Sequence, residues 1–100
     1  MQINIESPHV RLSTELEENL RLQFNRLAKL HNRISGCDVV LRVIKSSDQK
    51  NCEVEAHLLI PKSSFFASNK AETFEAAING TVESLRRQLE HKKDQQKEVW

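Results

Sequence analysis

The sequence predicts an α+β two-layer sandwich in the order βαβββα, with a four-stranded mixed sheet that carries two helices on one face. Three observations lead to this fold. Two long segments place apolar residues at helical spacing, four short segments have strand character, and a chain of 100 residues has room for one modest core. Gly and Pro are scarce, at 2 each, which is untypical of a disordered chain. We therefore expect residues 1–94 to form a single domain and residues 95–100 to form a frayed tail.

The first strand and the first helix follow from the N-terminal third of the sequence. QINIE at residues 2–6 alternates apolar and polar residues, so Ile3 and Ile5 share one face of a short strand. Ser13 and Thr14 are both candidate N-caps for a helix from residue 14 to about residue 31, because acidic residues fill its first turn. The apolar side of this helix recurs every three or four positions, at Leu16, Leu20, Phe24, Leu27 and His31.

The remaining elements are three strands and a second helix. Residues 37–45 are rich in β-branched side chains, and residues 65–69 form a short fourth strand. Residues 52–60 alternate clearly, which is typical of an antiparallel strand with one face in water, so both helices should cover the other face. Thr73 is the predicted cap of the second helix. Because a helix joins the first two strands, we expect them to be parallel, through a right-handed crossover.

The sequence does not indicate an enzyme, and we expect no catalytic residue, no metal site and no cofactor. It has no glycine-rich phosphate loop, and its four histidines lie on separate elements without ligand spacing. Cys37 and Cys52 have neither metal nor redox spacing, so free thiols in a reducing compartment are expected. Glu53 and Glu55 share a strand face but are predicted to be solvated. With neither a leader nor a long apolar run, the chain is predicted to be cytoplasmic.

Gly80 is unusual because it lies inside the second predicted helix. Glycine costs about 1 kcal/mol relative to alanine at such a position. Helical spacing places it away from the apolar side, so core packing gives no evident reason for it. Two interpretations stay open: a tolerated weakness in the helix, or the close approach of another macromolecule.

Basic residues are segregated on both helices, although the net charge is only +1. The first helix carries only basic charges from residue 19 to residue 37, at Arg21, Arg26, Lys29 and Arg33. The second helix contributes Arg86, Arg87, Lys92 and Lys93, which Glu83 and Glu90 partly neutralise. Two interpretations are open: solvated, ion-paired helix faces, or one combined surface that binds a phosphate backbone. The scarcity of exposed aromatic residues favours structured RNA over single strands.

The chain resembles the ribosome hibernation-promoting factor family, also called ribosome-associated translation inhibitors or sigma-54 modulation proteins, in its short form. The resemblance covers nearly the whole sequence and is strongest in MQINI (1–5), RLAKL (26–30), FAS (66–68), EAAING (75–80) and LRRQLEHKKD (85–94). It implies a protein that binds the small ribosomal subunit in the channel for mRNA and tRNA and blocks translation in stress or stationary phase. The resemblance implies that basic residues of both helices contact ribosomal RNA. Arg26, Lys29 and Arg87 occupy positions that are basic in this pattern, and Lys92 and Lys93 lie in a region that is usually basic.

The sequence departs from the family pattern at a few positions, and other functions stay open. Ser84 and His91 stand where the resemblance leads us to expect lysine. One alternative function is a generic module that binds double-stranded RNA. Another is a protein-interaction adaptor that uses the open sheet face around Glu53, Glu55, His57 and Phe66. None of these interpretations involves a membrane or a small-molecule substrate.

Overall fold

The computed structural model describes the backbone of residues 1–98 and the side chains of residues 1–91. Its elements follow the predicted order, with one 3-10 turn added after the first helix. They are β1 (Gln2–Glu6), α1 (Thr14–Asn25), η1 (Arg26–Lys29), β2 (Gly36–Val43), β3 (Cys52–Ile60), β4 (Ser63–Ala71) and α2 (Phe74–Glu98).

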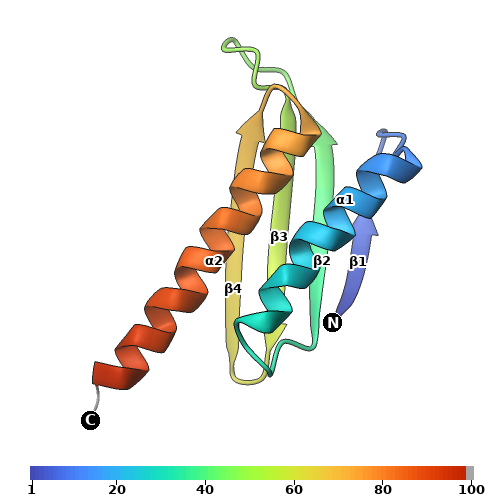
Figure 1. The fold of residues 1–100 in the computed structure, drawn as a ribbon. Coiled ribbons are helices and arrows are strands. Elements are labelled where there is room, and N and C mark those ends of the chain that lie inside the picture. The colour runs from blue at the N-terminus through green and yellow to red at the C-terminus, as the bar shows by residue number, and fades with distance from the viewer. Residues whose placement is uncertain (99–100) are drawn as a thin grey trace.

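One four-stranded sheet in the order β1-β2-β3-β4 forms the first layer, and the two helices form the second (Figure 1). β1 pairs with β2 in parallel, and the other two pairs are antiparallel. Both helices lie on the same face of the sheet, and α2 crosses it obliquely and extends beyond its β4 side (Figure 1). The predicted mixed sheet, the parallel first pair and the shared helical face are therefore confirmed.

The first helix differs from the prediction of one continuous helix to about residue 31. The α-helix begins after Ser13, whose Oγ accepts a hydrogen bond from the Leu16 amide at 3.1 Å, and it ends at Asn25. The next turn is the 3-10 turn η1, closed by a hydrogen bond from the Leu30 amide to the Leu27 carbonyl at 3.0 Å. Phe24 and Leu27 lie three residues apart, a spacing that suits three residues per turn as well as 3.6, so it did not reveal the change.

The bounds of two strands also differ from the prediction. β2 ends at Val43 rather than at residue 45. β4 has nine residues rather than five, because a two-residue turn of Pro61 and Lys62 connects it directly to β3, and Ile60 pairs with Ser63. A tight turn leaves no loop between two strands, so pairing begins at once on either side of it.

The core lies between the sheet and the helices. Buried residues of the two helices, Leu20, Phe24, Leu27, Ala77, Ile78, Leu85 and Leu89, meet the inward side chains of β2 and β3. Among the described side chains, Thr81 is the one polar group that is fully buried. Its hydroxyl lies 3.2 Å from the Val54 carbonyl and 2.8 Å from the Ala77 carbonyl, so its hydrogen-bonding capacity is satisfied.

Gly80 is explained by packing inside this chain. A Cβ atom at residue 80 would lie 2.5 Å from Cγ and from Oδ1 of Asn69 on β4, and 2.6 Å from Nδ2. The glycine therefore leaves room for a strand side chain beneath α2. This contact supplies the packing reason that helical spacing did not reveal, so the glycine is explained without either earlier interpretation. The thermodynamic cost of glycine in a helix is offset by a closer approach of helix and sheet.

Candidate nucleic-acid interface

The end of the first helix presents two basic side chains on one side. Arg26 and Lys29 both lie on η1 and are exposed. In a 3-10 turn, side chains three apart lie one above the other, so these two cations are aligned. Arg26 donates a hydrogen bond to the Gln23 amide oxygen at 3.3 Å. Within residues 1–91, neither cation has a carboxylate at ion-pair distance, so both charges are available to a ligand.

Arg21 and Arg33 do not lie in line with Arg26 and Lys29. Arg21 forms an ion pair with Glu17 at 3.3 Å and lies 3.4 Å from the Ile3 carbonyl, so it faces β1. Arg33 would share the side of Arg26 and Lys29 only if the helix reached residue 33. Because the helical turns end at Lys29, Arg33 projects from the loop before β2, where it is exposed.

The arginines of α2 are adjacent in sequence but differ in environment. Arg86 is held between two carboxylates, with Nη1 2.6 Å from Glu90 and with Nε 3.0 Å from Glu83, which it also binds through Nη2. The hydrogen bond to Glu83 is the largest cause that raises the pKa of Arg86, and the hydrogen bond to Glu90 adds to it. Arg86 in turn lowers the pKa of Glu83. The Arg87 side chain is 74% exposed, and its Nε lies 3.7 Å from Glu83. Arg87 is therefore the freer of the two cations.

Lys92 and Lys93 lie within the backbone span of α2, but their side chains lie outside the described residues. Their predicted role as RNA contacts stays a prediction.

The two basic segments belong to neighbouring elements. α1 and η1 both contact α2, and Figure 1 shows the end of the first helix beside the middle of α2. The packing predicted from the two apolar faces therefore places Arg26, Lys29 and Arg87 on adjoining elements of the helical layer. A surface of this kind offers several cations at fixed positions, which is what binding to a phosphate backbone requires.

The open face of the sheet has a different character. Glu53 and Glu55 share Arg42 as an ion-pair partner, at 3.3 Å and 2.7 Å, and hydrogen bonding to Glu55 is the main cause that raises the pKa of Arg42. The two carboxylates are thus neutralised by a residue that the sequence analysis did not include, although it lies opposite Glu53 in the β2–β3 register. Phe66 is 56% exposed on β4, as predicted. This face offers paired charges rather than a pair of reactive acids.

Both cysteines are free, as predicted, and Cys37 is completely buried. Burial, reinforced by the charge of Asp38, raises the pKa of the Cys37 thiol to about 12, so this thiol is not a nucleophile at neutral pH. Within the described residues, no group of three or more His, Cys, Asp and Glu side chains could hold a metal ion. None of the helices in residues 1–98 combines the length and the apolar character that a membrane span needs.

Comparison with known proteins identifies the family. Residues 3–97 match the family described as sigma 54 modulation protein / S30EA ribosomal protein. This chain belongs to that family. A ribosome hibernation promoting factor of Escherichia coli (strain K12) is 32% identical over 98 residues, covering 98% of this chain and 99% of that protein. A protein of the same name from Pseudomonas putida KT2440 is 29% identical over 99 residues, covering 99% of this chain and 93% of its own length.

Solved structures of more distant sequence share the fold of this S30EA family member. A ribosomal subunit interface protein from Coxiella burnetii superimposes with a TM-score of 0.82 at 20% identity, covering 94% of this chain and 99% of the other. The N-terminal domain of Thermus thermophilus Protein Y gives a TM-score of 0.79 at 17% identity, covering 91% and 98%. The βαβββα sandwich is therefore a fold that other proteins of low sequence identity also adopt.

Proposed function

We propose that this protein is a ribosome hibernation factor. In this proposal it binds the small ribosomal subunit through the basic side chains of its helical layer and occupies the channel for mRNA and tRNA. Translation is then blocked by occlusion during stress or in stationary phase. The observation that carries the proposal is the acid-free pair Arg26 and Lys29 on η1, beside the helix that exposes Arg87. Family membership and the names of the relatives support it.

The geometry suits recognition of structured RNA. Occlusion needs no reaction, only a rigid body with cations that displace counterions from phosphates. The sheet with its packed helices supplies the rigid body. Phe66 is the one aromatic side chain among the described residues that is largely exposed, and it lies on β4 rather than on a helix. Stacking on a series of unpaired bases would need more such side chains, so we infer that phosphate backbone and RNA shape dominate the contact.

The proposal is tested by charge reversal of the helical surface. The triple variant R26E/K29E/R87E should lose binding to purified small subunits, measured by co-sedimentation. Three lost phosphate contacts reduce affinity by roughly 100- to 500-fold at 0.1 M salt and flatten the salt dependence by about 2 to 3 log units per decade. Far-ultraviolet circular dichroism should remain unchanged, because all three side chains are exposed.

A matched control carries the same change in net charge elsewhere. Lys45, Lys50 and Lys70 are exposed cations that lie away from the end of the first helix, near the β2–β3 turn and at the end of β4. The variant K45E/K50E/K70E should bind small subunits nearly as well as the wild type. Equal losses in the two triple variants would mean that only net charge matters. Tighter binding to a naked RNA duplex than to intact subunits would favour the generic double-stranded RNA module instead.

A further inference from the structure

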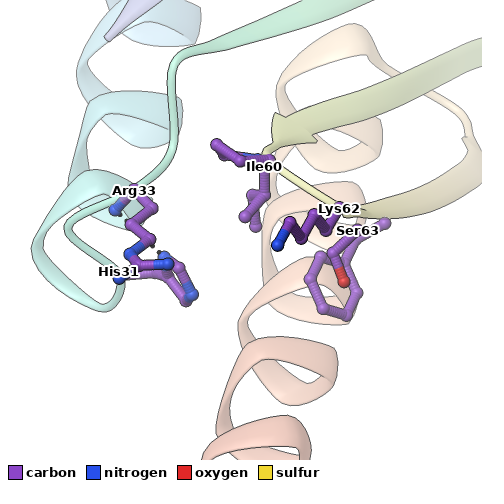
Figure 2. Close-up of a pocket in the computed structure, with 7 residues that line it drawn as sticks. His31, Arg33, Ile60, Lys62 and Ser63 are labelled. Atoms are coloured by element: carbon purple, nitrogen blue, oxygen red, sulfur yellow. Dashed lines mark hydrogen bonds between the residues drawn. The ribbon is translucent and has the colours of Figure 1, made fainter.

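A pocket lies at the end of the sheet that is nearest to η1. It has a volume of about 240 Å³ and lies between the loop that follows η1 and the turn that joins β3 to β4. His31 and Arg33 line one side, and Lys62 lines the other, with Ile60, Pro61 and Phe65 as apolar neighbours. Figure 2 shows His31 and Arg33 facing the turn across the opening, with the Lys62 ammonium directed into the space between them. Two segments far apart in the sequence therefore form one site.

Apart from the Ser63 hydroxyl, which both donates and accepts, the polar side chains that line this pocket can act as hydrogen-bond donors. No carboxylate lines it, and Arg33 and Lys62 are exposed side chains without an ion-pair partner in the described part of the chain. Nδ1 of His31 accepts a hydrogen bond from the Arg33 backbone N–H at 3.1 Å. Nε2 of the neutral imidazole therefore carries the proton and can donate it to a ligand. A guanidinium, an ammonium and an imidazole N–H converge on a space that an anionic oxygen would satisfy.

Lys62 occupies a backbone conformation that does not favour lysine. Its φ angle is 65°, in the left-handed region, in a two-residue turn where glycine or asparagine would fit without strain. The turn requires this backbone conformation, but it does not require a lysine side chain. Strain of this kind concentrates where a side chain is needed for binding. The turn thus directs an ammonium group into the pocket at some expense of stability.

The size and the apolar part of the pocket define the ligand further. Pockets for drug-sized ligands measure roughly 300–1,000 Å³, so this one suits a smaller unit. Phe65 is half-buried against the core and borders the opening, and a base or sugar could lie against it. A phosphate beside a planar group is the chemistry of one nucleotide.

We propose that this pocket binds a single nucleotide of structured RNA, with its phosphate held by Arg33, Lys62 and the His31 Nε2–H group and its base or sugar against Phe65. The inference rests on the proposed function, because the RNA is that of the small ribosomal subunit. It adds a contact from the edge of the sheet to those from the helices. The bound RNA would then touch both layers of the sandwich, which fixes the orientation of the protein on it.

The decisive experiment separates stability from binding at Lys62. The variant K62G removes the cation and relieves the left-handed strain, so we expect Tm to rise by roughly 2–5 °C. Affinity for small subunits should nevertheless fall by about five- to eightfold at 0.1 M salt, and the salt slope should fall by about 0.7 to 0.9. K62R retains a cation and should bind like the wild type. K45G, which removes a lysine near the β2–β3 turn, is the control for net charge.

A second variant tests the apolar side. F65L removes the aromatic ring and should weaken binding at least fivefold without changing the salt slope, because stacking releases no counterions. The inference is overturned if K62G binds like the wild type, or if K62G and K45G lose affinity equally. If K62G and F65L bind normally while R26E/K29E/R87E does not bind, the result supports RNA binding by the helical surface and refutes RNA binding by the pocket. If all of these variants bind normally, the proposed function fails as well.

Discussion

Neutralising two acids on α2 should strengthen RNA binding. Glu83 and Glu90 hold Arg86 between them, and Glu83 also lies 3.7 Å from Arg87. Both carboxylates project from the helix face that presents these arginines, so they compete with phosphate for the cations and repel it. The variant E83Q/E90Q keeps the size of both side chains, replaces one accepting oxygen of each with an NH2 donor, and removes both negative charges. It should release Arg86 for contact with RNA.

The size of this gain follows from counterion release. One additional phosphate contact steepens the salt dependence by about 0.7 to 0.9 log units per decade, the lower value for single strands and the upper for duplex. Relative to 1 M salt, where this contribution vanishes, the same contact strengthens binding by about five- to eightfold at 0.1 M salt. The gain should decline steadily as salt is added.

The assay is a titration of labelled protein with purified small subunits at several salt concentrations. E15Q/E18Q is the matched control, because it removes two exposed acids near the start of α1, in the half of that helix away from η1. Charges more than about 8 Å apart are largely screened at physiological salt, so this control should bind like the wild type. Unchanged or weaker binding of E83Q/E90Q would refute the idea that this face of α2 contacts phosphate.

Three further predictions concern the fold. Gly80→Ala should destabilise the protein because the new methyl displaces the Asn69 amide, whereas the same substitution in an Asn69→Ala background should stabilise it by about 1 kcal/mol in urea denaturation. Thr81→Val should lower the free energy of unfolding by about 1 kcal/mol, because it removes the buried hydroxyl together with its hydrogen bonds to the Val54 and Ala77 carbonyls. Burial raises the pKa of Cys37 from 9.0 to about 12, so the unfolded chain ionises first. The stability from this group is complete below pH 9 and is lost as pH rises toward 12, and Cys37→Ala should flatten that part of a pH–stability curve.

The sequence predicted the fold where periodicity was unambiguous. Residues 52–60 alternate over their whole length, and β3 has those bounds. The end of the first helix was predicted poorly because the three-residue spacing from Phe24 to Leu27 fits a 3-10 turn and an α-helix equally well. β4 was predicted too short because the polar residues at its ends weaken the alternation, although the Pro61–Lys62 turn fixes the pairing. Periodicity thus identifies the faces of an element more reliably than its ends.

Ion pairing on α2 shows a second limit. The spacing of four residues between Glu83 and Arg87 favours an ion pair on a helix. In the structure Glu83 binds Arg86 more closely, three residues away, and Glu90 binds Arg86 from the other side. Spacings of three and four are both compatible with a helix, so the choice between two adjacent arginines depends on rotamers that the sequence does not reveal. That choice decides which arginine remains available to RNA.

The remaining features that the sequence did not predict depend on contacts between elements. Gly80 and Asn69 become neighbours only because α2 packs across β4, and Lys62 and Arg33 line one pocket only because a strand turn and a helix–strand loop lie at the same end of the sheet. The close approach at Gly80 also bears on function. It holds α2 against β4, where the Gln88 amide donates a hydrogen bond to the Phe66 carbonyl at 2.9 Å. Side chains of α2 that project from the opposite side are thereby held at a fixed position relative to η1. A basic surface that is made of two elements needs this fixed position if its cations are to match the phosphates of a structured RNA.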